Sequence, residues 1–314
     1  MKKKHIQSTS TILMIQPVSF RYNEQTAVNN YYQKTLENLT ADNAQERALK
    51  EFNDFTAKLI DKGINVITVK DTQTPDTPDS IFPNNWISFH ENGSVGLYPM
   101  YAKNRRLERR EDILEHLEKE GFIIHDIIDY TQAEEENIFL EGTGSMILDR
   151  ENRKAYLAVS PRSDESLFIE FCEDFEFTPI IFKSYQTVKN HRELIYHTNV
   201  MMCVGDQYVV ICLDSIDDKK EKQLVINSLQ EDRKEIIAIT EEQVNQFAGN
   251  MLQVQGSDSK YLVMSESAYN SLTKEQRKTI EKYNPILHSD LSVIETCGGG
   301  SARCMMAEVF LPRK

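Results

Sequence analysis

The chain has 314 residues, of which 40% are apolar, enough for one large domain or two ordinary ones with a buried core. Its 36 Lys and Arg against 49 Asp and Glu give a net charge of −13, which argues against nucleic-acid binding because that needs clustered basic charge. No apolar run approaches the ~20 residues of a membrane-spanning helix, and the apolar stretch after the basic start is too short for a signal peptide. Five cysteines without CxxC spacing are typical of free thiols in a reducing compartment. We therefore expect a cytoplasmic globular protein.

Strand and helix patterns alternate along the chain. Short apolar runs predict strands, and apolar residues three and four apart predict amphipathic helices. In chain order the sequence predicts a strand at 12–15, a helix at 48–60, a strand at 64–69, a helix at 107–117, strands at 122–124, 146–148 and 156–159, a helix at 165–171, a strand at 208–211, a helix at 219–229, a strand at 261–264 and a helix at 273–280. This alternation indicates an α/β fold. No linker or low-complexity segment divides the chain.

A turn of small or polar residues that leads straight into an apolar strand occurs five times. The strand starts are marked by Trp86, Met146, Met201, Met251 and Met305, at steps of 60, 55, 50 and 54 residues. A regular period usually means stacked or radial units, so we expect five βαβ-type units in a closed array, with the five turns at one mouth. Chance similarity among strand starts is the alternative. A closed array would use the whole length as a single domain, 1–314.

The glycine-rich run before Cys304 is the first candidate for chemistry. Three glycines at 298–300 let the backbone pass close to a ligand. Arg303 and nearby backbone N–H groups would favour the thiolate of Cys304, which makes this residue a candidate nucleophile. A structural turn with an incidental buried thiol is the alternative. Cys297, which precedes the glycines, is the rival nucleophile.

Three of the other turns carry residues that could assist such a cysteine. His197 lies in one turn, and histidine is the usual proton partner of a cysteine nucleophile. Glu141 lies in another, and Asn84 and Asn85 lie in a third. If the five units close, these side chains face one mouth together with Cys304. No metal-ligand spacing, P-loop or dinucleotide-binding motif is present, so the sequence predicts neither a metal nor a cofactor.

These motifs together resemble the pentein superfamily of guanidine-modifying enzymes, which includes arginine deiminases, dimethylargininases and amidinotransferases. The resemblance covers nearly the whole chain and rests on the runs 97–101 with Arg105, Arg106 and Glu108, 139–142, His197, and 298–305. The turn at 83–86 is similar to one in bacterial citrulline-utilisation hydrolases. The resemblance implies a five-bladed, pseudo-symmetric α/β propeller (the pentein fold) with a central active site. It also implies that Cys304, His197 and Glu141 are catalytic.

The chain departs from the deiminase pattern at polar positions. It has Asn85 and Asn199 where deiminases carry Asp, and Gly142-Thr143-Gly144 where they carry Gly-Gly-Asp. A guanidinium group has only donors and a permanent positive charge, so its pocket favours carboxylates. A ureido group is neutral and has a carbonyl acceptor, which an asparagine amide complements. The departures therefore favour a ureido substrate, with a turn-capping role for Asn85 as the alternative.

The resemblance and its departures imply a cysteine-dependent hydrolase that acts on the ureido, or guanidino, carbon of a small amino acid. Citrulline is the expected substrate, giving ornithine, ammonia and carbon dioxide. The expected substrate-binding residues are Asn84, Asn85, Asn199, Arg303, and the pair Arg105 and Arg162, which match positions that hold the substrate α-carboxylate. The alternatives are an arginine deiminase or amidinotransferase with a guanidino substrate, and a non-catalytic pentein ribosome-binding factor. We expect no nucleic-acid or membrane partner, and the sequence leaves open whether the protein is a homo-oligomer.

Overall fold

The computed structural model describes residues 5–35 and 40–314. Within these residues the strands form five three-stranded sheets and one two-stranded hairpin. The strands are β1 (Thr11–Gln16), β2 (Asn65–Lys70), β3 (Ile87–Phe89), β4 (Ser94–Leu97), β5 (Asp126–Asp129), β6 (Met146–Asp149), β7 (Lys154–Ala158), β8 (Thr178–Phe182), β9 (Tyr185–Val188), β10 (His191–Leu194), β11 (Met202–Val204), β12 (Tyr208–Ile211), β13 (Glu235–Ala238), β14 (Leu252–Gln255), β15 (Lys260–Ser265), β16 (Ile286–Ser289) and β17 (Ala307–Glu308).

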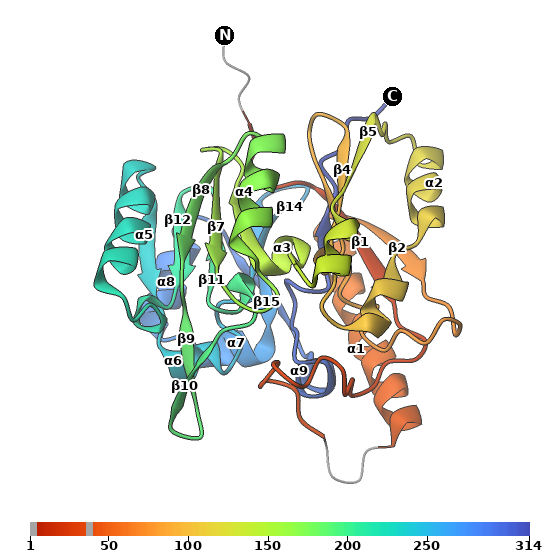
Figure 1. Ribbon diagram of the computed structural model, residues 1–314, viewed down its shortest axis with the longest axis horizontal. Helices are drawn as coiled ribbons and strands as arrows, with labels where there is room; N and C mark the ends of the chain where they lie inside the picture. Colours follow the sequence, from red (N-terminus) through yellow and green to blue (C-terminus); the bar gives the residue numbers. More distant parts are fainter. Residues whose placement is uncertain (1–4, 36–39) are drawn as a thin grey trace.

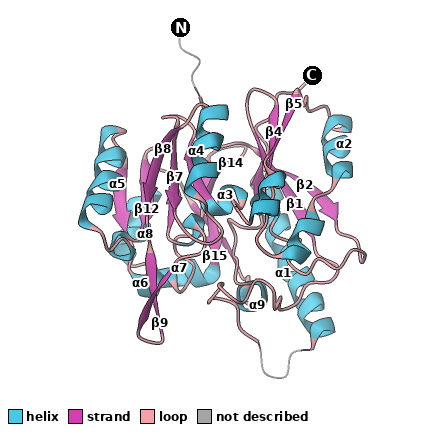
Figure 2. Cartoon of the chain, viewed as in Figure 1, coloured by secondary structure: helices cyan, strands magenta, loops and turns pink. Residues whose placement is uncertain are grey.

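The helices connect the strands of these sheets. They are α1 (Ala41–Asp61), α2 (Glu111–Lys119), α3 (Gly142–Ser145), α4 (Glu165–Asp174), α5 (Lys219–Glu231), α6 (Glu241–Val244), α7 (Glu266–Ser271), α8 (Lys274–Glu281) and α9 (Ser292–Gly298), with 3₁₀ turns that include η1 (Pro83–Asn85), η2 (Lys103–Glu108) and η4 (Thr198–Val200). Figure 1 shows α3 near the centre of the view, and α2 and α5 lie at opposite edges in Figures 1 and 2. None of the described helices is both long enough and apolar enough to cross a membrane.

All five three-stranded sheets share one topology. The first strand is antiparallel to the middle strand, and the middle strand is parallel to the third, as in β6-β7-β8 and β11-β12-β13. A parallel pair needs a crossover, which helices such as α4 and α5 supply. The sheet β17-β1-β2 is built from both ends of the chain, because β17 pairs with β1. The predicted α/β class is confirmed, and the five sheets correspond to the five predicted units.

The five polar turns lie directly before the first strands of the five sheets. The turns lead into β3, β6, β11, β14 and β17. The turn before β6 contains α3, which contacts η1 in the turn before β3 and η4 in the turn before β11. Side chains from turns that are 50 to 60 residues apart in the sequence are therefore placed close together.

The N-terminal helix α1 supports the loop that carries Cys304. The apolar face of α1, which includes Phe52 and Phe55, is buried in one core cluster with Cys304 and part of α9. Glu51 on α1 accepts hydrogen bonds from the backbone N–H groups of Val293 at 2.9 Å and Ile294 at 3.0 Å. A carboxylate in this place satisfies free donors at the start of α9 and opposes its positive dipole end.

Two predicted elements differ from the structure. The expected helix at 107–117 begins only at Glu111, because the chain before it forms η2 and Arg110 is extended. The expected strand at 122–124 is wrong: Phe122 forms an isolated bridge with Arg313, and the third strand of that sheet is β5. Apolar runs report burial, and here Phe122 is buried without joining the sheet.

Candidate active site

Cys304 lies at the end of the glycine-rich loop that connects α9 to β17. Gly299 has a positive φ of 63°, which favours glycine, while Gly298 and Gly300 pack against the ring of Phe82. A Cβ atom would lie 2.8 Å from that ring at position 298 and 2.9 Å from it at position 300. The loop therefore needs its glycines to pass this close to Phe82, and Cys304 at its end is only 3% exposed.

Two asparagine amides donate hydrogen bonds to the sulfur of Cys304. Nδ2 of Asn250 lies 3.2 Å from Sγ, and Nδ2 of Asn199 lies 3.4 Å from it. Both asparagines are buried, and Oδ1 of Asn250 accepts from the backbone N–H of Arg303 at 3.0 Å. Sequence reasoning named Asn199 but missed Asn250. The signal that could have identified Asn250 is its place in one of the five repeated turns.

His197 and Glu141 form a buried hydrogen-bonded pair. Nε2 of His197 lies 2.7 Å from Oε2 of Glu141, and Nη1 of Arg162 lies 3.5 Å from the same oxygen. Burial alone would raise the pKa of Glu141, but Arg162, His197 and Arg105 together lower it below its ordinary value. Burial lowers the pKa of His197 and outweighs the opposite effect of Glu141. Glu141 is therefore a carboxylate, and His197 is a neutral imidazole.

These protonation states fix the tautomer of His197. An ionised carboxylate only accepts hydrogen bonds, so Nε2 of His197 donates to Glu141 and Nδ1 keeps a lone pair. Gly144 leaves room beside this atom, because a Cβ there would lie 2.8 Å from Nδ1 and 2.3 Å from Nδ2 of Asn85. The absence of a side chain at position 144 thus allows His197 and Asn85 to lie close together.

Arg105 fixes the orientation of the Asn85 amide. Its Nη1 donates to Oδ1 of Asn85 at 2.7 Å, and its Nε and Nη2 donate to the two carboxylate oxygens of Glu108 at 2.9 Å and 2.8 Å. An arginine has only donors, so Asn85 must present its oxygen to Arg105. Nδ2 of Asn85 is then buried without a partner among the described residues. Asn85 therefore has a free donor in the cavity that it lines.

Arg162 is bonded to the segment that precedes α1. Its Nε donates to Oδ1 of Asn29 at 2.9 Å, and its Nη2 donates to the same oxygen and to the carbonyl of Thr26 at 2.8 Å. Thr26 also donates its hydroxyl to Oδ2 of Asp79 at 3.0 Å. The guanidinium expected to hold a substrate carboxylate is thus occupied by the protein itself.

Asp79 is a cavity residue that sequence reasoning missed. It is 2% exposed, and its Oδ1 has no partner within residues 5–35 and 40–314. Burial raises the pKa of Asp79, although Arg105 opposes this effect. The only signal in the sequence was an acidic residue shortly before the Asn84-Asn85 turn.

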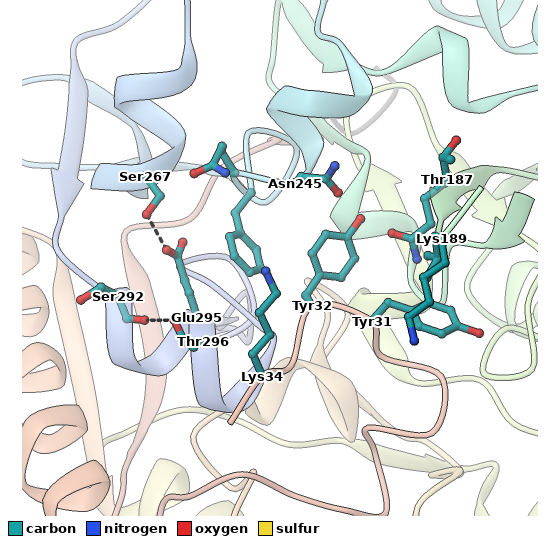
Figure 3. Close-up of a pocket in the computed structure, with 14 residues that line it drawn as sticks. Tyr31, Tyr32, Lys34, Thr187, Lys189, Asn245, Ser267, Ser292, Glu295 and Thr296 are labelled. Carbon is teal, nitrogen blue, oxygen red and sulfur yellow. Dashed lines mark hydrogen bonds between the residues drawn. The ribbon is translucent and has the colours of Figure 1, made fainter. Parts of the chain in front are cut away.

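The side chains around Cys304 enclose a small cavity. Its volume of about 10 Å³ holds about one water molecule. The lining comes from segments far apart in the sequence, namely Thr26, Asn30, Asp79, Phe82, Asn85, Arg105, Arg162, Tyr196, His197, Gly298, Gly300 and Cys304. A separate cleft of about 490 Å³ lies beside the β9–β10 hairpin, where Figure 3 shows Tyr32 between Lys34 and Lys189. Among the described residues, no three His, Cys, Asp or Glu are grouped so that they could hold a metal ion.

Of the nine predicted site residues, five line the cavity, two contact residues of the lining, and two lie elsewhere. Five line the cavity: Asn85, Arg105, Arg162, His197 and Cys304. Glu141 and Asn199 lie behind it, in contact with His197 and Cys304. Arg303 instead donates its guanidinium to the carbonyl of Met306 at 2.9 Å and to Glu308 at 3.0 Å. Asn84 is fully buried outside the lining, and its amide has no partner in the described ranges.

The rival nucleophile, Cys297, also lies outside the cavity lining. It is 3% exposed, and burial raises the pKa of its thiol above the ordinary value. Its backbone carbonyl accepts from Nε2 of Gln33 at 3.1 Å. Cys304 is therefore the only one of the five cysteines that lines this cavity.

The chain is similar in fold to several solved enzymes. One is the N-terminal domain of ArgZ, an arginine dihydrolase from cyanobacteria, solved with bound substrate: TM-score 0.71, 19% identity, covering 95% of this chain and 97% of that chain. Another is AgrE in complex with ornithine and NAD⁺, at TM-score 0.70 and 18% identity, where the match covers 98% of this chain but only 40% of the longer AgrE chain. A third is a dimethylarginine dimethylaminohydrolase adduct with S-methyl-L-thiocitrulline, at TM-score 0.62 and 13% identity, covering 95% and 98% of the two chains.

Comparison with known families gives a match over almost the whole sequence. No curated protein sequence matches the chain. Residues 16–311, however, match the family described as N,N dimethylarginine dimethylhydrolase, eukaryotic. The matched range includes all five sheets except residues 11–15 of β1, and it includes every residue of the cavity. The chain therefore belongs to the N,N dimethylarginine dimethylhydrolase family, within the pentein superfamily of guanidino-group-modifying enzymes.

Proposed function

We propose that this protein is a cysteine hydrolase that cleaves the ureido group of citrulline, or of a closely related amino acid, to give ornithine, ammonia and carbon dioxide. In this proposal Cys304 is the nucleophile, His197 moves protons, and Glu141 orients His197. We further propose that the five sheets are the blades of one closed domain over residues 1–314 around this cavity. The pairing of β17 with β1 supports this closure because it joins the two ends of the chain.

The orientation of the Asn85 amide is the observation that carries the ureido proposal. Because Arg105 donates to its oxygen, the unpartnered group that Asn85 offers to a substrate is its Nδ2 amide. A ureido group has a carbonyl oxygen that can accept from these donors, whereas a guanidinium group has no acceptor. The same donors would stabilise negative charge on that oxygen when Cys304 attacks, an effect of roughly 3–4 kcal/mol for a well-placed donor.

The proposed reaction has two stages. Nδ1 of His197 takes the proton of the Cys304 thiol as the sulfur adds to the ureido carbon, and His197 gives this proton to the departing nitrogen when the first C–N bond breaks. This leaves a thiocarbamate on Cys304. His197 then takes a proton from a water molecule that attacks the same carbon, and returns it to the sulfur as the C–S bond breaks. The carbamic acid released in this step breaks down to the second amine and carbon dioxide.

We propose that substrate binding requires residues 26–29 to move. A cavity of about 10 Å³ holds about one water molecule and is too small for citrulline. Asn29 and Thr26 occupy the donors of Arg162, a residue well suited to a bidentate carboxylate contact. We propose that the α-carboxylate of the substrate replaces Asn29 at Arg162 when this segment moves away.

Hydrolysis of arginine to ornithine is the second candidate function. The similar ArgZ domain is an arginine dihydrolase, and Asp79 offers an unpartnered carboxylate oxygen inside the cavity. Such an oxygen complements guanidinium donors. Arginine would then lose two ammonia molecules for each ornithine, whereas citrulline loses one.

A substrate panel tests the proposal. The protein is incubated separately with citrulline, arginine, and arginine plus glycine, and ammonia, ornithine and citrulline are measured. The proposal predicts one ammonia per ornithine from citrulline, and no product from a Cys304→Ala variant. Ornithine from arginine with two ammonia molecules, and none from added citrulline, would favour the second candidate. Citrulline accumulating from arginine would instead indicate a deiminase.

A further inference from the structure

The surroundings of the Cys304 sulfur contain amide donors from two different turns. Nδ2 of Asn250 and Nδ2 of Asn199 lie 3.2 Å and 3.4 Å from Sγ, as described above. Each asparagine is at most 1% exposed, so water does not compete for these contacts. Among the described residues, the side chains that form hydrogen bonds with this sulfur are these two amides, and no carboxylate contacts it in this way.

The Asn250 amide cannot turn over without losing contacts. Its Oδ1 accepts from Arg303 N–H at 3.0 Å, and its Nδ2 donates to the carbonyl of Asn199 at 3.1 Å as well as to the sulfur. Turning the amide over would place N–H against N–H and oxygen against oxygen. The donor is therefore held toward Cys304 by the backbone on both sides.

From this geometry we infer that Asn250 is a catalytic residue: its amide, with that of Asn199, stabilises the thiolate of Cys304 by direct N–H donation. The inference rests on the proposed role of Cys304 as nucleophile. A thiolate accepts such bonds more strongly than a neutral thiol, and charge-assisted bonds are about twice as strong as neutral ones. The amides give this stabilisation without a second charge in the cavity.

The charged and titratable groups near the sulfur come from several elements. Asp79, Arg105, Arg162, His197 and Tyr196 line the same cavity. Burial raises the pKa of Tyr196 well above its ordinary value, so Tyr196 stays neutral. The two arginines are already bonded to Glu108 and to the segment at 26–29. Asparagine amides therefore supply the direct contacts to sulfur.

The test titrates the Cys304 thiolate without any substrate. Thiolate absorbance in the ultraviolet is followed against pH for the wild type, Asn250→Ala, Asn199→Ala and Asn227→Ala. Each is compared with the same protein carrying Cys304→Ala, which subtracts the other four cysteines. Asn227 lies exposed on α5, so its variant controls for the loss of an asparagine amide away from the cavity. Ala at position 250 or 199 removes the donor to sulfur without adding a charge beside it.

We expect the midpoint of the Cys304 titration to rise by about one pH unit or more in Asn250→Ala, because a donor to a charged group is lost. Asn199→Ala should give a smaller rise because its contact is longer, and Asn227→Ala should give none. A folded Asn250→Ala with the wild-type midpoint would overturn the inference. If circular dichroism shows that Asn250→Ala does not fold, the Asn199→Ala variant provides the test, since it leaves the contacts of the Asn250 side chain with the backbone in place.

The titration separates this inference from the proposed function. If the wild type turns over no ureido or guanidino substrate, the proposed function fails, but the midpoints still report on the amides. If the wild type is active and the midpoints do not move, only the inference fails. A purely structural role for Asn250 would lower the melting temperature without moving the midpoint.

Discussion

The polar groups on the two sides of the cavity are stabilised differently, by opposite charges on one side and by neutral amides on the other. On one side, Glu141 is bonded to His197 and Arg162, so its charge is compensated. On the other side, Cys304 is contacted by the neutral amides of Asn199 and Asn250. Burial of an unpaired charge costs free energy of folding. A neutral donor avoids this cost and can still stabilise a negative charge that forms only during the reaction. The charged side is suited to holding His197 in position, and the amide side is suited to stabilising a transient negative charge on the sulfur of Cys304.

Removal of the sulfur should have the largest effect. We expect Cys304→Ala to lower ornithine release from citrulline by about 10⁴-fold or more, because the covalent step is lost. Cys297→Ala is the matched control, since Cys297 is equally buried but outside the cavity, and it should keep most of the activity. The reverse result would make Cys297 the nucleophile.

Removal of the proton carrier should have the next largest effect. His197→Ala should lower kcat by about 10²–10⁴-fold, the usual contribution of a positioned acid or base. The pH dependence of kcat should also flatten, because the group that takes up the proton is gone. His116→Ala on α2 is the control and should leave kcat unchanged. Equal activity of the two variants would remove His197 from the mechanism.

A single methyl group at Gly144 should displace His197, on the charged side of the cavity, and the amide of Asn85 beside it. The added Cβ would lie 2.3 Å from Nδ2 of Asn85 and 2.8 Å from Nδ1 of His197, so both must move. A displacement of about 1 Å at a reacting group costs about 10²-fold in rate, and we expect a loss of that size in Gly144→Ala. Steady-state kinetics measure it, with circular dichroism to show that the fold is kept. An unchanged kcat/KM would mean that the positions of Asn85 and His197 do not matter.

The smallest expected effect concerns the support of the Cys304 loop. Glu295 is 4% exposed and accepts from the hydroxyls of Ser301 at 2.6 Å and Ser267 at 2.7 Å, the second of which Figure 3 shows. Burial raises the pKa of Glu295 from 4.5 to about 7. Between these values the unfolded chain has released a proton that the native state keeps, so stability falls as pH rises through this window.

Glu295→Gln should abolish this fall, which amounts to at most about 3 kcal/mol. The measurement is the melting temperature at about pH 5 and about pH 8, and the decrease between them should be smaller in Glu295→Gln than in the wild type. Glu266→Gln, at an exposed site on α7, is the control. An identical decrease in wild type and Glu295→Gln would show that Glu295 is already ionised in the native state.

Much of the architecture was predictable because strands and turns are encoded locally. The runs at 146–148, 208–211 and 261–264 fall in β6, β12 and β15, and the repeated turns precede the first strands of the five sheets. The run at 122–124 was misassigned because its pairing partner, near Arg313, lies far along the chain. Local apolar content does not specify a distant partner.

The sequence by itself determined the α/β class, the five repeated units, and the positions of Cys304 and His197 in two of the turns. Only the tertiary structure showed that Asn250 donates to the sulfur, that Arg105 takes the oxygen of Asn85, and that Arg162 is bonded to Asn29. These contacts join residues 20 to 133 positions apart. Periodicity reveals which residues are buried, but the direction of a hydrogen bond depends on partners that folding brings together.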